Sequence, residues 1–155
     1  MEVMIWIWFD MDGTIGDFYG VPGCIEMIRA EDSTPYEIAA PLVDMSRLAR
    51  AIHKLQAQGV KAGINSWGAN YATPAFDEEV AEVKCDWLDE RIPSVNWDEI
   101  LITHYGVPKQ KCKKEGYINI LFDDNPNIRQ EWGEYAYAPE QIFEVLNALA
   151  KGNLL

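Results

Sequence analysis

The most constraining feature of the sequence is an apolar run at positions 3–9, VMIWIWF, which ends on two aspartates. The run is apolar at every position and rich in β-branched and aromatic residues, which is typical of a parallel strand covered on both faces. We therefore predict a central strand at 3–9. Asp10 and Asp12 follow it at once, with Gly13 and Thr14 beside them, so a buried strand ends on charged residues.

Strand patterns recur along the rest of the chain and alternate with helical patterns. Further strands are predicted at 60–65, 99–103, 117–122 and 134–138. Because strands that alternate with helices form parallel sheets covered by those helices, the sequence predicts an α/β fold. We expect a parallel sheet of about five strands with helices on both faces.

The helices are predicted from their start and stop signals. One begins in STPYE, with Thr34 as N-cap, Pro35 at the first helical position and Glu37 placed for a capping box. Another has an apolar face and stops at Gly59. Two more begin at Thr73–Pro74 and at about Pro139.

Polar side chains stand where the predicted strands end. Asn65 and Ser66 are expected to follow the second strand, and Asp123 and Asp124 the fourth. In an open α/β sheet, ligands bind beyond the carboxyl ends of the strands, so these residues should meet the two aspartates that follow the first strand. The sequence therefore predicts one site at this edge of the sheet.

Four carboxylates at one place need a cation. Two unit charges about 4 Å apart interact by about 4 kcal/mol at an effective dielectric near 20, so the cluster would be strongly repulsive by itself. Mg²⁺ is the predicted cofactor, because it binds a few carboxylates and leaves positions for water and a phosphoryl oxygen. The predicted ligands are Asp10, Asp12, Asp123 and Asp124.

The motifs DMDGT, GINS and ILFDDNP resemble three motifs of the haloacid dehalogenase-like phosphohydrolases. In that family one apolar strand ends in Asp-x-Asp-x-Thr, a second in Ser or Thr, and a later one in paired acids. A lysine between the last two is the remaining motif. The resemblance covers most of the chain, and it implies a Rossmann-like sheet in a single domain, 1–155.

The resemblance also implies roles for individual residues. Asp10 would attack phosphorus and become an aspartyl-phosphate. Asp12 would protonate the leaving oxygen and later help to deprotonate the attacking water. Ser66 would donate a hydrogen bond to the phosphoryl oxygens. Mg²⁺ would be held by Asp10, by the backbone carbonyl of Asp12, and by Asp123 or Asp124.

The lysine of the remaining motif comes from the run KQKCKK at 109–114. It would neutralise the charge that the transition state spreads over the phosphoryl oxygens. Lys109 fits a loop-to-helix position, whereas Lys113 matches the lysine-to-acid spacing of the deoxyribonucleotidases. We favour Lys109 and leave Lys113 open, with Lys111 and Lys114 as the other members of the run.

Within the family, DMDGTIGDF looks most like the 5'(3')-deoxyribonucleotidases and their bacterial and phage relatives. Phe18 matches an aromatic residue that lines the nucleoside pocket there, and such a ring can stack on a base. Trp67, just after Ser66, is a second candidate for substrate contact. Only a small helical insertion, roughly 20–42, is left to cover the site, so a second copy in a homo-oligomer could complete the pocket.

Composition restricts the partners. The net charge of −12 repels nucleic acid and anionic membrane surfaces, and the longest apolar run is far shorter than the roughly 20 residues that span a bilayer. The three cysteines are scattered without CxxC spacing, and this favours a reducing cytoplasm.

The predicted function is Mg²⁺-dependent hydrolysis of a small phosphorylated metabolite, with a (deoxy)nucleoside monophosphate favoured as substrate. Two alternatives stay open. One is a phosphatase that acts on the ends of polynucleotides, and the other is a non-catalytic binding protein that has the same fold.

Overall fold

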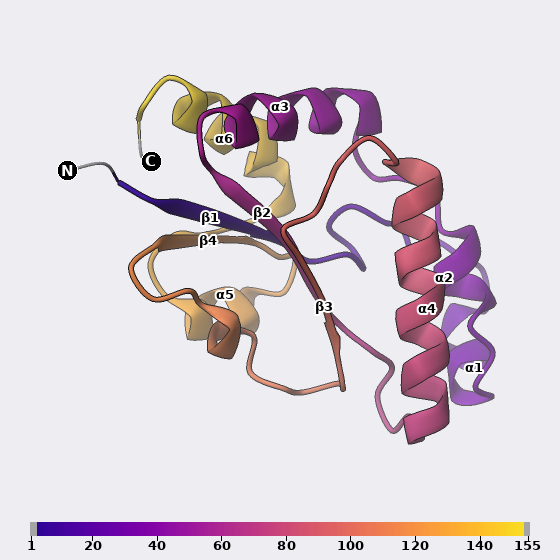
Figure 1. Cartoon of the computed structure of the whole chain (residues 1–155). Helices are drawn as coiled ribbons and strands as arrows, with labels where there is room; N and C mark the ends of the chain where they lie inside the picture. Colours follow the sequence, from indigo (N-terminus) through magenta and orange to yellow (C-terminus); the bar gives the residue numbers. More distant parts are fainter. Residues whose placement is uncertain (1–2, 154–155) are drawn as a thin grey trace.

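Five parallel strands form one sheet in the order β3-β2-β1-β4-β5, and Figure 1 labels the first four of them. The computed structural model describes residues 3–153. The strands are β1 (Ile5–Phe9), β2 (Lys61–Trp67), β3 (Glu99–Thr103), β4 (Ile118–Phe122) and β5 (Ala136–Tyr137). The predicted α/β class and the parallel sheet of about five strands are confirmed, and the fold is Rossmann-like.

Helices flank both faces of the sheet, as predicted. They are α1 (Cys24–Arg29), α2 (Thr34–Ile38), α3 (Met45–Ala57), α4 (Pro74–Arg91), α5 (Pro126–Trp132) and α6 (Ile142–Ala150), with 3-10 turns η1 (Lys109–Cys112) and η2 (Pro139–Gln141). Within residues 3–153, no helix combines the length and the apolar composition needed to cross a membrane.

Alternate residues of β1 point to the two faces of the sheet and build two separate parts of the core. Ile7 and Phe9 pack on one face with residues of α3, α4 and α6. Trp8 points to the other face and packs with Ile128 and Trp132 of α5. This explains why the sequence of the strand is apolar at every position: the central strand is covered on both sides.

The second strand is longer than predicted. Its pairing with β3 continues through Ser66↔Ile102 and Trp67↔Thr103, so the strand extends past the predicted end at Asn65 and includes Ser66, which was expected to follow it. The predicted end of the strand was wrong because Ser is a weak strand former, and tertiary pairing overrides that preference. Both residues still lie near the C-terminal edge of the sheet.

The insertion at 20–42 contains two short helices: α2 lies beside α4, and α1 packs against α2 (Figure 1). The N-cap of α2 is Ser33, and the hydroxyl of Thr34 donates instead to Asp32 Oδ1, so the predicted capping box was wrong. After α1, the Glu31 carboxylate accepts hydrogen bonds from the backbone N–H and the hydroxyl of Thr73, the N-cap of α4. These bonds tie the insertion to the start of α4.

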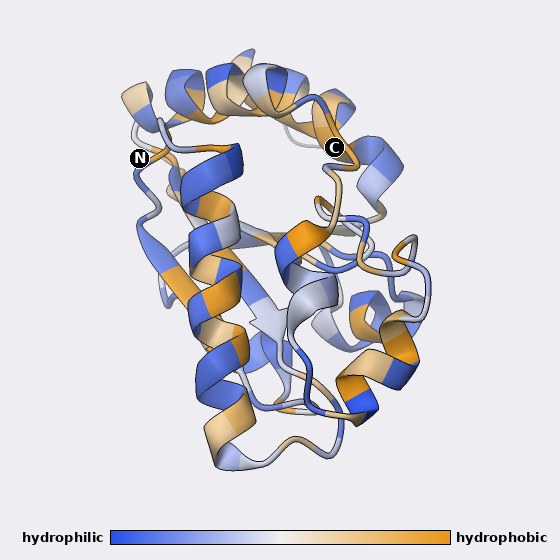
Figure 2. Cartoon of the chain, turned by 90° about the vertical axis from the view of Figure 1, so that its right-hand side faces the viewer, coloured by the Kyte–Doolittle hydropathy of each residue, from blue (hydrophilic) through white to orange (hydrophobic). Residues whose placement is uncertain are grey.

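Helix α4 is packed on two sides. Trp87 and Leu88 join the core on the sheet, whereas Phe76 and Val80 pack with Phe18 and other residues of the insertion. The apolar residues of α4 therefore do not form a single stripe, and Figure 2 shows polar and apolar residues interspersed along it.

Candidate functional site

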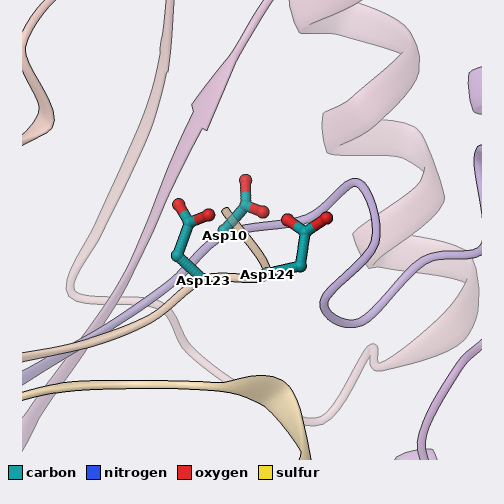
Figure 3. A group of neighbouring side chains, drawn as sticks. All are labelled: Asp10, Asp123 and Asp124. Atoms are coloured by element: carbon teal, nitrogen blue, oxygen red, sulfur yellow. The ribbon is translucent and has the colours of Figure 1, made fainter. Parts of the chain in front are cut away.

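Two neighbouring strands end on carboxylates at the same edge of the sheet. Phe9 of β1 pairs with Phe122 of β4 in parallel register, so the residues that follow them, Asp10 and Asp123, emerge side by side. The backbone N–H of Asp10 donates to the carbonyl of Phe122 over 2.9 Å and extends the pairing by one residue. Figure 3 shows both side chains, with Asp124, gathered at this edge.

Asp10, Asp123 and Asp124 form a cluster that could hold a metal ion, because one ligand oxygen from each lies within 4.8 Å of the others. Asp10 is 6% exposed and Asp123 is 1% exposed. Burial and the charge of Asp10 raise the pKa of Asp123 to about 6. The same two causes, together with a hydrogen bond to Asp10, raise the pKa of Asp124 to about 7. Burial is the larger cause of both shifts, and repulsion by the charge of Asp10 adds to it.

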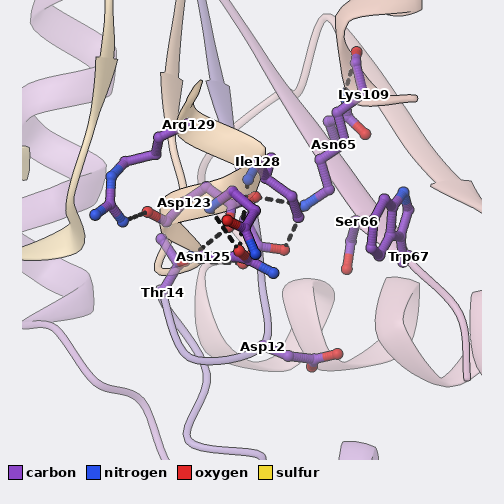
Figure 4. A network of polar contacts seen from close by, with 12 residues as sticks. Asp12, Thr14, Asn65, Ser66, Trp67, Lys109, Asp123, Asn125, Ile128 and Arg129 are labelled. Atoms are coloured by element: carbon purple, nitrogen blue, oxygen red, sulfur yellow. Dashed lines mark hydrogen bonds and ion pairs between the residues drawn. The ribbon is translucent and has the colours of Figure 1, made fainter. Parts of the chain in front are cut away.

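Lys109 offsets part of this negative charge. Its Nζ donates to Asp10 Oδ1 over 2.9 Å and to Asp123 Oδ2 over 2.7 Å. Burial disfavours the charged ammonium, but the charges of Asp10 and Asp123 outweigh it, so the pKa of Lys109 is raised. Asn65 holds the turn that carries the lysine, because its side-chain N–H donates to the carbonyl of Lys109. Figure 4 shows this network.

The other lysines of the run KQKCKK contact different parts of the chain. Lys113 Nζ donates to the carbonyl of Trp132 over 2.7 Å, and Lys114 forms an ion pair with Glu99. Lys111 is exposed. Of the two positions left open by the sequence, Lys109 and Lys113, the structure brings Lys109 to the carboxylates.

A tight turn after β1 places the second aspartate of DMDGT. The carbonyl of Met11 accepts from three successive backbone N–H groups, those of residues 14–16. The Thr14 hydroxyl donates to Asp10 Oδ2 over 2.9 Å. Gly13 has φ +78°, and a Cβ there would lie 2.3 Å from Asp124 Oδ2. Glycine is therefore required by both the backbone conformation and the adjacent carboxylate.

Asp12 lies apart from the cluster of three carboxylates, and its carboxylate pairs with Lys84 of α4, Nζ to Oδ2 over 2.8 Å. Burial raises the pKa of Asp12; the positive charge of Lys84 opposes this shift and the negative charge of Asp10 adds to it. The predicted metal ligands thus divide into three clustered carboxylates and one that is paired with a lysine.

Lys84 is the site residue that sequence reasoning missed. It is 1% exposed and also contacts Ser66, whose hydroxyl oxygen accepts from Nζ over 2.9 Å. Its position in α4 is a usable signal: Lys84 lies four residues after Val80 and three before Trp87, both buried. A lysine at an apolar position of a buried helix indicates an ion pair in the interior.

A cavity of about 660 Å³ opens above the carboxylates. Asp10, Asp12, Lys109 and both paired acids line it. Its aromatic lining residues are Phe18, Tyr19, Tyr36, Trp67, Tyr71 and Tyr105. The volume is in the range of pockets that bind small molecules.

The two residues predicted to contact substrate, Phe18 and Trp67, differ in how exposed their side chains are. Phe18 is 5% exposed because it packs in the core of the insertion, with its ring stacked on Tyr36 at a centroid distance of 4.6 Å. Trp67 is partly exposed, and its Nε1 donates to the carbonyl of Val107. Ser66, the predicted phosphate donor, is fully buried, directly precedes Trp67 in β2 and is not among the described residues that line the cavity. Their functional roles stay predictions.

Comparisons with known proteins do not identify a family. No protein-family model matches the chain, and no curated protein is a significant match. The class of protein is therefore defined by the fold and the site: a Rossmann-like α/β protein with an acidic cluster, able to hold a metal ion, at the C-terminal edge of its sheet.

Proposed function

We propose that this protein is a Mg²⁺-dependent phosphatase that hydrolyses a small phosphate monoester through an aspartyl-phosphate on Asp10. The observation that carries the proposal is the setting of Asp10: its carboxylate lines the cavity, accepts a hydrogen bond from Lys109 and clusters with two further carboxylates. A phosphoryl group has to meet a nucleophile beside positive charge, and this setting supplies both. The resemblance of DMDGT and ILFDDNP to the haloacid dehalogenase-like motifs supports the same reaction.

The charges of the site fit a divalent cation. The three clustered carboxylates, when ionised, against the ammonium group of Lys109 leave two negative charges, which is the charge that one Mg²⁺ would balance. Oxygen donors are the ligands that Mg²⁺ prefers. Asp10, Asp123 and Asp124 would hold the ion, and when bound it would polarise the phosphoryl oxygens.

The side chains of this protein carry the proton and the phosphoryl group. A carboxylate oxygen of Asp10 forms a bond to phosphorus while the bond from phosphorus to the ester oxygen breaks, and Asp12 gives its proton to that oxygen. Water then attacks the phosphorus of the aspartyl-phosphate, and Asp12 takes a proton from this water. The bond between Asp10 and phosphorus breaks, and inorganic phosphate leaves. Within the described residues, the two carboxylates use two of the three Lys109 donors, and the third is available to a phosphoryl oxygen.

The walls of the cavity support a nucleoside monophosphate as the substrate. Aromatic side chains can stack on a base, and Arg29 of α1 adds a guanidinium to the lining. A polynucleotide would need a positive groove along its backbone, which a protein of net charge −12 does not favour.

The test is phosphate release by the purified protein with Mg²⁺ and a substrate panel. The panel contains nucleoside 5'-monophosphates, sugar phosphates, p-nitrophenyl phosphate and 3'-phosphorylated oligonucleotides. We expect turnover of the small monoesters, fastest with the nucleotides, and its loss when the metal is chelated. Turnover of the oligonucleotides alone would instead favour the polynucleotide-end phosphatase, and binding without turnover would favour the non-catalytic protein.

Mg²⁺ should stabilise the protein, and more so at higher pH. Asp123 and Asp124 have folded-state pKa values of about 6 and about 7, above their ordinary value of 3.8. Between the ordinary value of 3.8 and these folded-state values, the folded protein without metal therefore binds more protons than the unfolded chain. Its stability falls as the pH rises through that range. At about pH 8 both carboxylates are free to bind Mg²⁺, whereas at about pH 5 protons compete for them.

Thermal unfolding measures this effect. Mg²⁺ at about 100 times its Kd should stabilise the protein by about 2.7 kcal/mol, or about 5–10 °C, at high pH. The Asp124→Asn variant should show a smaller shift, while Asp89→Asn, at an exposed position of α4, should behave as the wild type does. A melting temperature that does not respond to Mg²⁺ at about pH 8 would contradict the metal site.

A further inference from the structure

Lys84 places a buried ammonium group beside the site. Its Nζ donates three hydrogen bonds: to Asp12 Oδ2 over 2.8 Å, to Ser66 Oγ over 2.9 Å and to the carbonyl of Trp67 over 2.8 Å. The Nζ also lies 4.6 Å from the centre of the Tyr36 ring. An ammonium group that is 1% exposed is unfavourable unless it is paired and fully hydrogen-bonded, and these contacts satisfy it.

The arrangement of donors separates Lys84 from Lys109. An ammonium group has three N–H donors, and Lys84 uses all three on the protein. Lys109 lines the cavity, whereas Lys84 is not among the described residues that line it. Lys84 therefore has neither a donor nor a direct path to a phosphoryl oxygen, and its effect has to pass through one of its partners.

Two of these partners belong to a strand of the sheet, and the third lies in a turn. Ser66 and the Trp67 carbonyl belong to β2, an inner strand of the sheet, and Lys84 itself belongs to the 18-residue helix α4. Asp12 lies outside the regular strands, in the turn after β1, with its side chain 22% exposed and on the cavity wall. The strand and the helix thus hold the ammonium group in place, and the ammonium group holds Asp12.

We infer that Lys84 is a positioning residue that orients the Asp12 carboxyl group toward the oxygen of the leaving group. The inference rests on the proposed phosphatase function, in which the Asp12 proton passes to the ester oxygen as the bond from phosphorus to that oxygen breaks. Without Lys84, the side chain of Asp12 keeps its chemistry but loses its fixed orientation. A misplacement of about 1 Å in such a geometry lowers a rate by about 100-fold.

The Lys84→Met variant tests this on two substrates that differ in their need for a proton. The ester oxygen of a nucleoside monophosphate needs a proton in order to leave as an alcohol. p-Nitrophenolate, in contrast, leaves as a stable anion without a proton. In a single turnover, the variant should release nucleoside about 100-fold more slowly than the wild type. It should release p-nitrophenolate at close to the wild-type rate, and the concentration that gives half the maximal single-turnover rate should be unchanged for both substrates. Lys54→Met, at an exposed position of α3, is the matched control.

A double variant decides between orientation of Asp12 and a general effect on the fold. In an Asp12→Asn background, Lys84→Met should lower single-turnover nucleoside release no further, because residues that act as one unit are non-additive. This comparison holds even if Lys84→Met alone does not fold, since the double variant removes both partners of the buried pair. A further loss in the double variant, or equal losses on both substrates in the single variant, would overturn the inference. If the wild type releases phosphate from no monoester, the proposed function itself is wrong, a result distinct from either of these.

Discussion

Replacement of Asp10 by asparagine should lower phosphate release by at least about 10³-fold, because a neutral amide cannot attack phosphorus as a carboxylate does. The substitution preserves the shape of the side chain. The amide oxygen can still accept from the Thr14 hydroxyl or from Lys109, and Lys109 keeps its bond to Asp123. We therefore expect a folded, inactive protein. Asp89→Asn is the control, because it makes the same change at an exposed position.

The covalent intermediate gives a second measurement for Asp10. An acyl phosphate reacts with hydroxylamine to give a hydroxamate and inorganic phosphate. Wild-type protein treated with hydroxylamine during turnover should therefore carry a hydroxamate at Asp10, which peptide mass spectrometry can locate. The Asp10→Asn protein should carry none. A wild-type rate in that variant, or modification at another residue, would exclude the aspartyl-phosphate mechanism.

The sheet could be predicted from the sequence because its strands are marked by continuous apolar runs. The run at 3–9 is apolar throughout and proves to be central, with Ile7 and Trp8 buried on opposite faces. The carboxylates stand where such runs end, and parallel strands bring their C-terminal ends to one edge. The meeting of Asp10 with Asp123 was therefore predictable from strand patterns, before any contact was known.

The lysines were harder to place because their contacts are long-range. Lys109 and Lys113 share one short run. Which of them reaches the carboxylates depends on Asn65 of β2, whose side chain holds the turn at Lys109. Lys84 looked like one of many charged residues on α4. Its burial depends on Asp12, 72 residues away in the sequence, and on the insertion that covers the other side of the helix. Local periodicity carries no information about such partners.

The short helices of the insertion illustrate a different limit. Helix α1 has six residues and no side-chain N-cap, and it follows a glycine with φ +73°. A helix this short is not stable by itself, so it depends on tertiary packing and leaves little local signal. That packing comes from the cluster around Phe18 and Tyr36, which also explains why Phe18 is nearly buried although it lines the cavity.

Replacement of Asp12 by asparagine should have an effect that depends on the leaving group. With a nucleoside monophosphate, the rate should fall by about 10²–10⁴-fold, the usual contribution of general acid–base catalysis. With p-nitrophenyl phosphate, the first step needs no proton and should stay fast. The second step should become slow, because the variant cannot take a proton from the attacking water.

Rapid mixing of the Asp12→Asn protein with p-nitrophenyl phosphate should therefore give a burst of p-nitrophenolate, one for each active site, followed by slow turnover. The wild type should show a much smaller burst if its two steps are of similar speed, and the Asp89→Asn control should match it. The asparagine oxygen can still accept from Lys84, which keeps its bonds to Ser66 and to the Trp67 carbonyl, but the buried ammonium group loses its charged partner, so the variant should be folded and less stable than the wild type. Equal losses on both substrates without a burst would mean that Asp12 shapes the site and does not move the proton. Because Asp10 remains intact in this variant, a burst together with a hydroxamate at Asp10 would separate the two aspartates of DMDGT into one that attacks and one that transfers a proton.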